Sequence, residues 1–550
     1  MPVFARNVVA TSQPLAASVG LETLRRGGNA MDAALATAIC LTVVEPTSNG
    51  IGSDAFALIW SGGELQGLNA SGKSPANWDV SRFDGMEQVP LRGWDAVTVP
   101  GAVDAWVQCS RRFGRMPFSE LFDGALRYAE DGFHVSPVIG LVWARAAEAF
   151  KGFPAFYDTF MPGDKAPEIG SIMFLPDHAE TLRLIAESEG EAFYRGEIAE
   201  KIVKDAEANG AAMSLDDLAQ HESEWVEPIS IGFHGVDLNE IPPNGQGLAA
   251  LIALGVLRHT PVLDFPIDSA DSVHHQIEAM KIAFAEVFAH LSDPATMRAS
   301  VDELLDDTYL KKQADSIDPK SAGKARSMLA AAPSTVYLCT ADDEGMMVSF
   351  IQSNYYGFGS GVVVPGTGIA LQNRGCGFTL EKDHPNEAAP GKRPFHTIIP
   401  GFVTSERGLS ARIQDHGLSV REPAPMESAV LQSAQDDNPA HSQNALMAFG
   451  VMGGHMQAQG HVQTVLRTFG HGQNPQAASD APRWQVSEDG EVLLEEGFDT
   501  SVADNLAARE HKVKTNMAPG HFGGGQYILK LEDGYCAASD HRKDGCALGF

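Results

Sequence analysis

The stretch from residue 31 to residue 43 constrains the fold most, because its composition predicts a helix that is apolar on every side. Asn29 is a favourable N-cap for this helix, and Asp32 lies in its first turn, where a negative charge complements the helix dipole. A helix without a polar face has to be buried. Strand-like segments follow at 55–60 and 64–69, so this part of the chain predicts a helix layer packed on a sheet.

Helices and strands alternate along the rest of the chain without an internal repeat or a clean linker. Its 550 residues are 44% apolar and 20% charged, which is typical of a globular protein with a large core. We therefore expect one large α/β or α+β unit. The segment 405–444 differs, because it is polar and lacks periodicity, which predicts a mobile, exposed insertion. The clearest further elements are helices at 13–26, 248–257, 273–290 and 455–469, a helical region at 98–222, and strands at 397–403 and 445–449.

The chain is acidic, with 71 Asp and Glu against 40 Lys and Arg and a formal net charge of −31. Nucleic acids and anionic membranes are bound by clustered basic residues, so we expect neither as a partner. The N-terminus lacks the apolar core of a signal peptide, and no apolar run reaches the length of a membrane span, which predicts a cytoplasmic protein. The six cysteines form no Cys-x-x-Cys pair and are expected to be reduced thiols.

Two strand-like runs at 333–340 and 346–353 flank an acidic turn and predict a β-hairpin. Thr335 lies at its start, after a segment rich in Ala, Ser and Lys. A threonine hydroxyl is a weak nucleophile unless a base lies beside it, and the α-amine of an N-terminal threonine can be that base. The reference pKa of an α-amine, about 7.7–8.0, suits this role near neutral pH. Cleavage before Thr335 would create such a residue, but β-propensity alone favours an ordinary strand threonine.

The pair Gly453–Gly454 precedes a predicted helix. Its two N–H groups could form an oxyanion hole, or the glycines could merely relieve crowding. The run at 523–525 lacks the Lys and Ser/Thr of a phosphate loop, so we predict a tight turn there. The histidines lack carboxylate partners at metal-ligand spacing, so we predict structural or surface roles for them, no metal and no other cofactor. These histidines are His274, His275, His455, His461 and His471.

Ten short stretches follow one another in order from end to end of the chain. They are residues 20–34, 49–53 (Asn49-Gly50-Ile51-Gly52-Ser53), 99–101 (Val99-Pro100-Gly101), 114–117, 242–245 (Pro242-Pro243-Asn244-Gly245), Thr335 with its hairpin, 358–361, 392–394 (Lys392-Arg393-Pro394), 453–454 and 474–483. Together these stretches resemble the gamma-glutamyltranspeptidase family. Each stretch is a weak signal alone, whereas the ordered set is specific and favours catalytic roles for Thr335 and the glycine pair.

The resemblance implies an N-terminal-nucleophile hydrolase, which is an α+β protein with a four-layer αββα sandwich and here a helical portion in the large chain. Self-cleavage between Ser334 and Thr335 would give a large subunit, 1–334, and a small subunit, 335–550, that stay together as a heterodimer or as a dimer of such heterodimers. Thr335 would attack a small-molecule amide, Gly453 and Gly454 would hold the oxyanion, and Ser353 would support the nucleophile. Water or an amine would then take the acyl group.

The positions that bind the α-carboxylate of a γ-glutamyl substrate in family members are changed in this chain. The arginine of glutathione-cleaving members falls on Ser71, with Lys73 nearby as a point charge. The serine pair of those members falls on His396 and Thr397. A γ-glutamyl group would therefore be held differently here.

The positions that bind the substrate's α-amine are changed as well. They fall on Tyr355, Arg374 and Gly377, so a cation replaces the usual carboxylate. A cation repels an ammonium group and attracts a carboxylate, which favours an acylase-like enzyme for amides with an acidic acyl group. Two alternatives are a true gamma-glutamyl hydrolase or transpeptidase acting on glutathione-like substrates and an unprocessed, inactive scaffold.

Overall fold

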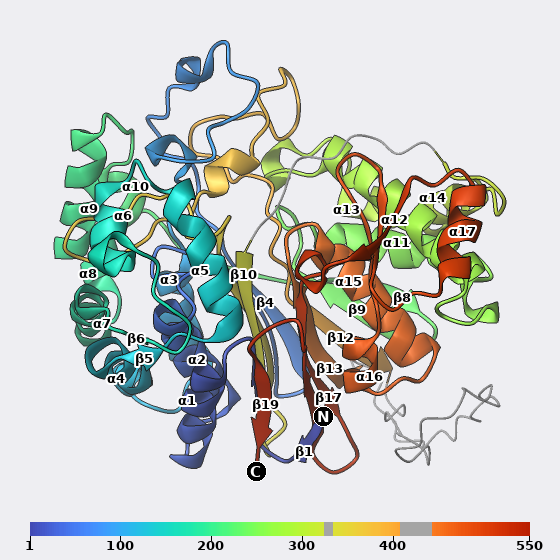
Figure 1. Ribbon diagram of the computed structural model, residues 1–550, viewed down its shortest axis with the longest axis horizontal. Coiled ribbons are helices and arrows are strands. Elements are labelled where there is room, and N and C mark those ends of the chain that lie inside the picture. Colours follow the sequence, from blue (N-terminus) through green and yellow to red (C-terminus); the bar gives the residue numbers. More distant parts are fainter. Residues whose placement is uncertain (324–333, 407–442) are drawn as a thin grey trace.

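Two antiparallel, seven-stranded sheets form the centre of the molecule (Figure 1). The computed structural model describes residues 1–323, 334–406 and 443–550. In spatial order the first sheet contains β1 (Val3–Ala5), β18 (Tyr535–Ser539), β17 (Gly524–Lys530), β13 (Gln443–Met452), β12 (Gly401–Glu406), β9 (Val236–Glu240) and β8 (Ile229–Phe233). The second contains β19 (Cys546–Gly549), β2 (Val8–Thr11), β10 (Ser334–Ala341), β11 (Met347–Tyr355), β3 (Asp54–Ser61), β4 (Glu64–Ala70) and β7 (Glu224–Val226).

The two sheets pack against each other through alternate residues of their strands. In β10, Tyr337 and Cys339 join a buried cluster that also contains Phe402 and Ile528 of the first sheet. Val336 and Leu338, on the opposite face of the same strand, belong to a cluster formed with helices. This alternation follows from the two-residue period of a strand, so both faces of β10 are buried.

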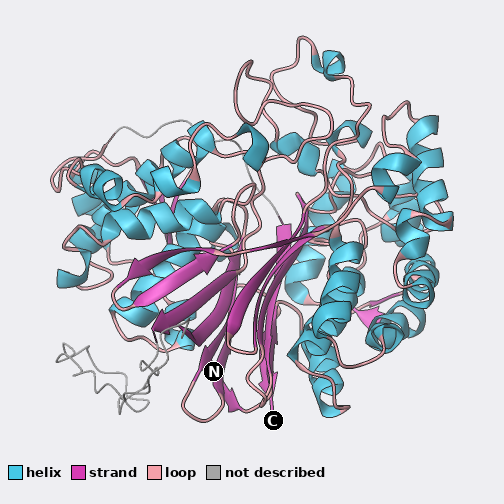
Figure 2. Ribbon diagram, turned by 180° about the vertical axis from the view of Figure 1, so that it is seen from behind, coloured by secondary structure: helices cyan, strands magenta, loops and turns pink. Residues whose placement is uncertain are grey.

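Helices cover the outer faces of both sheets, as Figure 2 shows from behind. The helix α2 (Ala30–Val44) packs on the second sheet, and every one of its residues is buried, which confirms the prediction from its apolar composition. Asn29 and Asp32 form the capping box at its start. The helices α11 (Gly247–Leu257), α12 (Ala270–His290) and α15 (Met456–Val465) share a second cluster with strands of the first sheet. The prediction of an α+β protein is confirmed.

The described residues also form further α-helices and two small sheets. The helices are α1 (Pro14–Arg25), α3 (Ala102–Phe113), α4 (Asp123–Asp131), α5 (Pro137–Ala149), α6 (Pro154–Phe160), α7 (Pro176–Ser188), α8 (Glu191–Tyr194), α9 (Glu197–Ala208), α10 (Leu215–Ala219), α13 (Val301–Leu304), α14 (Asp307–Ala314), α16 (Pro475–Asp480) and α17 (Thr500–Ala508). The small sheets are formed by β14 (Trp484–Val486), β15 (Val492–Glu495) and β16 (Val513–Met517), and by β5 (Phe133–His134) and β6 (Ile172–Met173).

Two predicted boundaries are wrong. The strand expected at 397–403 begins only at Gly401, because Pro400 has no N–H and the N–H of Ile399 bonds to the side chain of Gln457. The insertion expected at 405–444 is shorter, because Ser405 pairs with Asn444 in the ladder between β12 and β13. The rest of that insertion, 407–442, lies outside the described residues.

All six cysteines are free thiols, as expected. Within residues 1–323, 334–406 and 443–550, no helix combines the length and the apolar character that crossing a membrane requires.

Candidate active site

The predicted hairpin is present as β10 and β11, and Thr335 is the second residue of β10. Ser334 pairs with Tyr355 and Val336 pairs with Gln352, so two residues of β11, Ser353 and Asn354, lie opposite Thr335. Such a β-bulge redirects the side chains around it. Thr335 Oγ1 lies 3.1 Å from Ser353 Oγ, and both residues are buried. The structure thus brings together the two hydroxyls that the sequence analysis selected.

Arg374 lies at the start of a short 3-10 helix, η7 (Arg374–Gly377), that also contains the predicted position Gly377. Its guanidinium stacks on Tyr355, with Cζ 3.6 Å from the ring centroid, and its Nη1 donates to Thr397 Oγ1 at 3.1 Å. Arg374 is 1% exposed, and its Nη2 has no hydrogen-bond partner among the described residues. Burial lowers the pKa of Arg374, and the charges of Tyr355 and Asp54 counteract this effect. A buried cation with an unused donor is able to bind an anion.

Asp54 is the first residue of β3 and pairs with Ser353 across the sheet. Asp54 Oδ2 lies 3.1 Å from His396 Nε2, and both side chains are buried. The N–H of Ile398 donates to His396 Nδ1 at 3.3 Å, so Nδ1 is an acceptor and Nε2 carries the imidazole proton. The Nε2–H group therefore donates a hydrogen bond to Asp54. Burial raises the pKa of Asp54 to about 7, although nearby cations and backbone N–H groups lower it. Burial and the charge of Arg374 hold the pKa of His396 well below its usual range.

Gly453 and Gly454 link β13 to α15 and have φ angles of +131° and +59°. Their N–H groups donate no hydrogen bond within the described part of the chain, which leaves them available to an oxyanion. Gln246 Nε2 donates to the carbonyl oxygens of Gly454 at 2.7 Å and of Thr397 at 2.5 Å. This amide joins the glycine pair to the residues around Arg374. The predicted turn before β17 supports the same loop, because a Cβ at Gly523 would lie 2.0 Å from the carbonyl oxygen of Met452.

Ser71 and Lys73 differ in their surroundings. Ser71 is buried, and its hydroxyl donates to Asn69 Oδ1 at 2.7 Å and lies 3.2 Å from Asn244 Nδ2. Asn244 in turn accepts the N–H of His396 at 2.9 Å, so Ser71 adjoins the cluster. The Lys73 side chain is exposed, and no hydrogen bond or ion pair joins it to the cluster within the described residues. Its role in binding stays a prediction.

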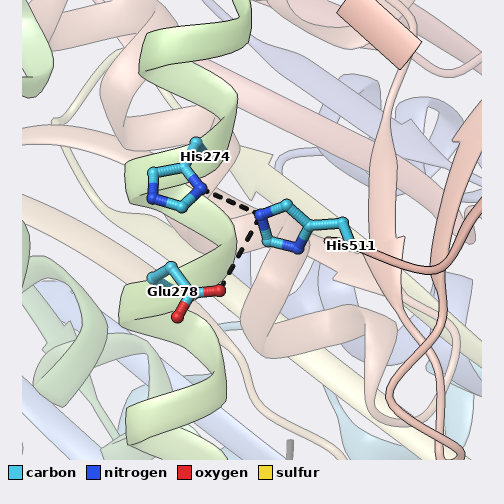
Figure 3. Close-up of side chains that lie close together, drawn as sticks. All are labelled: His274, Glu278 and His511. Carbon is cyan, nitrogen blue, oxygen red and sulfur yellow. Dashed lines mark hydrogen bonds and ion pairs between the residues drawn. The ribbon is translucent and has the colours of Figure 1, made fainter. Parts of the chain in front are cut away.

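A second polar cluster, distant in sequence from Thr335, has the composition of a metal site (Figure 3). His274 Nδ1, Glu278 Oε1 and His511 Nε2 all lie within 4.8 Å of one another. Lys281 Nζ lies 2.8 Å from Glu278 Oε1 and 3.3 Å from His511 Nδ1, and His274 Nε2 lies 2.9 Å from the carbonyl oxygen of Asp318. Lys281 therefore donates to His511, His511 to His274, and His274 to Asp318. Because this chain of hydrogen bonds uses every ring nitrogen, we interpret the cluster as structural.

Cavities of about 360 and 510 Å³ are lined by other described residues. Trp94 and Phe153 line the smaller one, and Asp104 and Tyr194 line the larger one. Thr335 lines neither cavity and is only 1% exposed, so the chemistry of this site rests on its buried contacts.

The sequence analysis missed Asp54 and Gln246. Asp54 lay in a loop of small residues ahead of a strand, and the available signal was a single carboxylate beside a run that is otherwise apolar. Gln246 follows a turn and offered no signal, because its role is to bridge two carbonyl oxygens from segments far away in the sequence.

This chain is similar to known proteins over nearly its whole length. The family model described as gamma-glutamyltranspeptidase matches residues 16–413 and 439–550. A glutathione hydrolase-like YwrD proenzyme of Bacillus subtilis (strain 168) is 33% identical, covering 99% of this chain and 98% of the relative. An oxamate amidohydrolase proenzyme of Klebsiella pneumoniae is also 33% identical, covering 98% and 97%. The crystal structure of a cephalosporin acylase from Bacillus halodurans has a TM-score of 0.88 and 43% identity, covering 100% of this chain and 97% of that one.

Proposed function

Because the chain belongs to the gamma-glutamyltranspeptidase family, we propose that it is a self-processing amidohydrolase with Thr335 as its nucleophile. The relatives are named as acylases, amidohydrolases and glutathione hydrolases, which supports an enzyme of this family. The two relatives reported above are named proenzymes, which supports processing here. The contact between Thr335 and Ser353 supports the choice of nucleophile, since the second hydroxyl orients the first.

The proposed self-cleavage converts one peptide bond into a new pair of termini. Thr335 Oγ attacks the carbonyl carbon of Ser334, the C–N bond breaks, and the nitrogen takes up the hydroxyl proton. This shift frees the α-amine of Thr335 and leaves an ester on Thr335 Oγ, which water hydrolyses to a carboxylate on Ser334 and the hydroxyl of Thr335. That amine is the base for later turnovers. The expected subunits are 1–334 and 335–550.

In turnover the same hydroxyl attacks the carbonyl carbon of an amide. The N–H groups of Gly453 and Gly454 stabilise the oxyanion, the amine leaves with the transferred proton, and the acyl group remains as an ester on Thr335. Water then releases the acid. We infer that the layers follow the αββα order of N-terminal-nucleophile hydrolases, because helices share clusters with the outer face of each sheet.

The acyl group of the substrate is proposed to end in a carboxylate, and Arg374 is the observation that carries this proposal. Its Nη2 is buried without a partner among the described residues, and its charge lies within the cluster that contains Thr397 and Tyr355. A hydrogen bond to a charged group contributes about 1.5–3 kcal/mol, which corresponds to roughly 10- to 150-fold in selectivity. Oxamate, the substrate in the name of one relative, is also an amide whose acyl part ends in a carboxylate.

A gamma-glutamyl hydrolase is the competing candidate, and Asp54 is the observation that favours it. A γ-glutamyl group carries an α-carboxylate, which Arg374 could bind, and an α-ammonium, which a buried carboxylate such as Asp54 could bind. Asp54, however, already accepts hydrogen bonds from His396 and from the N–H of Gly101, whereas Nη2 of Arg374 has no partner in the described residues. Because Asp54 is already engaged, the site favours an acyl group that has the carboxylate but lacks the ammonium.

Three anilides that differ only in the acyl tail test the substrate proposal: glutaryl, butyryl and γ-glutamyl. We expect the glutaryl anilide to have the highest kcat/KM, by about tenfold or more over the butyryl anilide. Arg374→Met should remove that preference. Arg112→Met is the matched control, because Arg112 also stacks on an aromatic ring, Trp225, and contacts none of the cluster residues in the described part of the chain. A preference for the γ-glutamyl anilide contradicts the proposal.

Mass spectrometry of the purified protein tests self-processing and the scaffold alternative. Wild-type protein should give two chains, the smaller beginning at Thr335. Thr335→Ala should remain a single inactive chain. A single inactive chain in the wild type would favour the scaffold, and cleavage of Thr335→Ala would overturn the choice of nucleophile.

A further inference from the structure

Arg374 and Asp54 carry opposite charges within one buried cluster, yet no ion pair within 4.0 Å joins them in the described residues. Adjacent residues of one segment contact each of them: His396 contacts Asp54 and Thr397 contacts Arg374. Each charge still affects the other, because Arg374 lowers the pKa of Asp54 and Asp54 raises the pKa of Arg374. The two groups thus share one electrostatic environment without direct contact.

The donors around Asp54 carry no charge. They are the imidazole N–H of His396 at 3.1 Å, the backbone N–H of Gly101 at 3.2 Å and the backbone N–H of Gly72. The titratable and charged groups that face Asp54 from the elements around it are Arg374, Arg393, His396 and Tyr194. No second carboxylate is among these groups, so a carboxylate brought to Arg374 by a substrate would be the nearest new anion.

We propose that Asp54 determines the charge preference of the acyl site. This inference rests on the proposed function, in which Arg374 receives the acidic end of the acyl group. When Asp54 is protonated, Arg374 is the dominant charge and the site favours a carboxylate. When Asp54 is ionised, it offsets Arg374 and repels a second anion, so the preference for an acidic tail weakens.

Burial and the nearby cations have opposite effects on the pKa of Asp54, which supports a change in its protonation state near neutral pH. Burial raises the pKa of Asp54 to about 7, and an anion bound at Arg374 would raise it further, because like charges disfavour ionisation. By linkage, binding of the anion is then accompanied by proton uptake. The affinity of the site for a carboxylate therefore falls as the pH rises through 7.

The pH dependence of substrate preference tests this assignment. The ratio of kcat/KM for the glutaryl and butyryl anilides cancels the titration of the nucleophile, because both substrates share it. In the wild type we expect the ratio to fall about fivefold between pH 6 and pH 8, as a shift of one pKa unit or more on binding requires. In Asp54→Asn the ratio should not change with pH. Glu240→Gln is the matched control, because Glu240 is another buried carboxylate paired with a histidine, His461, at 2.6 Å.

A second measurement uses only the wild-type protein and so does not depend on the folding of Asp54→Asn. Calorimetry of glutarate binding at pH 7, in two buffers of different ionisation enthalpy, should show net proton uptake. Absence of uptake, or a glutaryl preference that is constant with pH, overturns the role of Asp54 and leaves the proposed function intact. A glutaryl anilide that is not preferred at any pH overturns the proposed acidic acyl group and, with it, this inference.

Discussion

The hydroxyl of Ser353 connects two parts of the candidate site. It lies 3.1 Å from Thr335 Oγ1 and accepts the N–H of Tyr355 at 2.8 Å. Tyr355 in turn provides the ring on which Arg374 stacks. The bulge in β11 makes this possible, because the extra residue shifts the alternation of side chains at this point of the strand. One oxygen atom thus links the proposed nucleophile to the proposed acyl site.

Ser353→Ala should slow both self-cleavage and turnover by about five- to tenfold, because a hydrogen bond of this kind contributes about 1 kcal/mol. Ser353→Thr keeps the hydroxyl and should retain most of the rate. Time courses of cleavage on denaturing gels measure the effect. Ser349→Ala is the control, since Ser349 is a buried hydroxyl of the same strand that bonds to Tyr337 at 2.7 Å. Equal rates for Ser353→Ala and the wild type would contradict the assigned role.

Residues with a chemical signature were the ones that the sequence could identify. Thr335 and Ser353 stood in a predicted hairpin, and the order of family-like motifs selected them. Asp54 could not be selected in this way, because its partner His396 is 342 positions away and only the tertiary fold joins them. A pattern read along the chain describes neighbours in sequence, whereas this site depends on contacts between distant segments.

A helix or strand could be predicted from the sequence where all of its sides are buried. The prediction was less accurate where pairing with another strand determines the structure. The apolar composition of α2 determined its position, since no face of it could meet water. Ser405 and Asn444 have the composition of a loop, yet they extend the ladder between β12 and β13, because strand formation depends on the partner strand. The residues around His396 show the opposite case, in which apolar neighbours form no strand because their backbone groups bond elsewhere.

The contact between α12 and His511 should make stability depend on pH. Burial and the charge of Lys281 lower the pKa of His511 to about 3. The reference pKa of histidine is about 6.5, so between these values the unfolded chain binds a proton that the folded chain does not. The contribution of His511 to the free energy of unfolding is therefore complete above about pH 6.5. It falls by about 1.4 kcal/mol for each pH unit below that value. At pH 5 the loss relative to pH 7 should be about 2 kcal/mol.

Urea unfolding at pH 5 and pH 7 measures this loss. His511→Gln should reduce the difference between the two pH values by about 2 kcal/mol, because glutamine does not titrate. His521→Gln changes an exposed histidine and should leave the difference as in the wild type. A difference that is the same in all three proteins would show that His511 does not control the acid sensitivity.

At the scale of the whole molecule, the two proposed subunits are interleaved. In the second sheet, β10 of 335–550 lies between β2 of 1–334 and β11 of its own subunit. In the first sheet, β18 pairs with β1 and β12 pairs with β9, again across the proposed division. Figure 1 shows the corresponding mixture of colours from both ends of the sequence at the centre of the molecule. A cut before Thr335 therefore divides the chain but neither sheet.

The cleaved chains should accordingly behave as one particle. We expect fragments of 334 and 216 residues on denaturing gels, but co-elution on native size exclusion and a single unfolding transition, because separation would break both sheets. Expressed alone, 335–550 should aggregate or remain unfolded, since β10, β12 and β18 would each lose a neighbouring strand and expose an edge. A soluble, cooperatively folded 335–550, or fragments that separate without denaturant, would mean that the strand pairing across the division contributes little to stability.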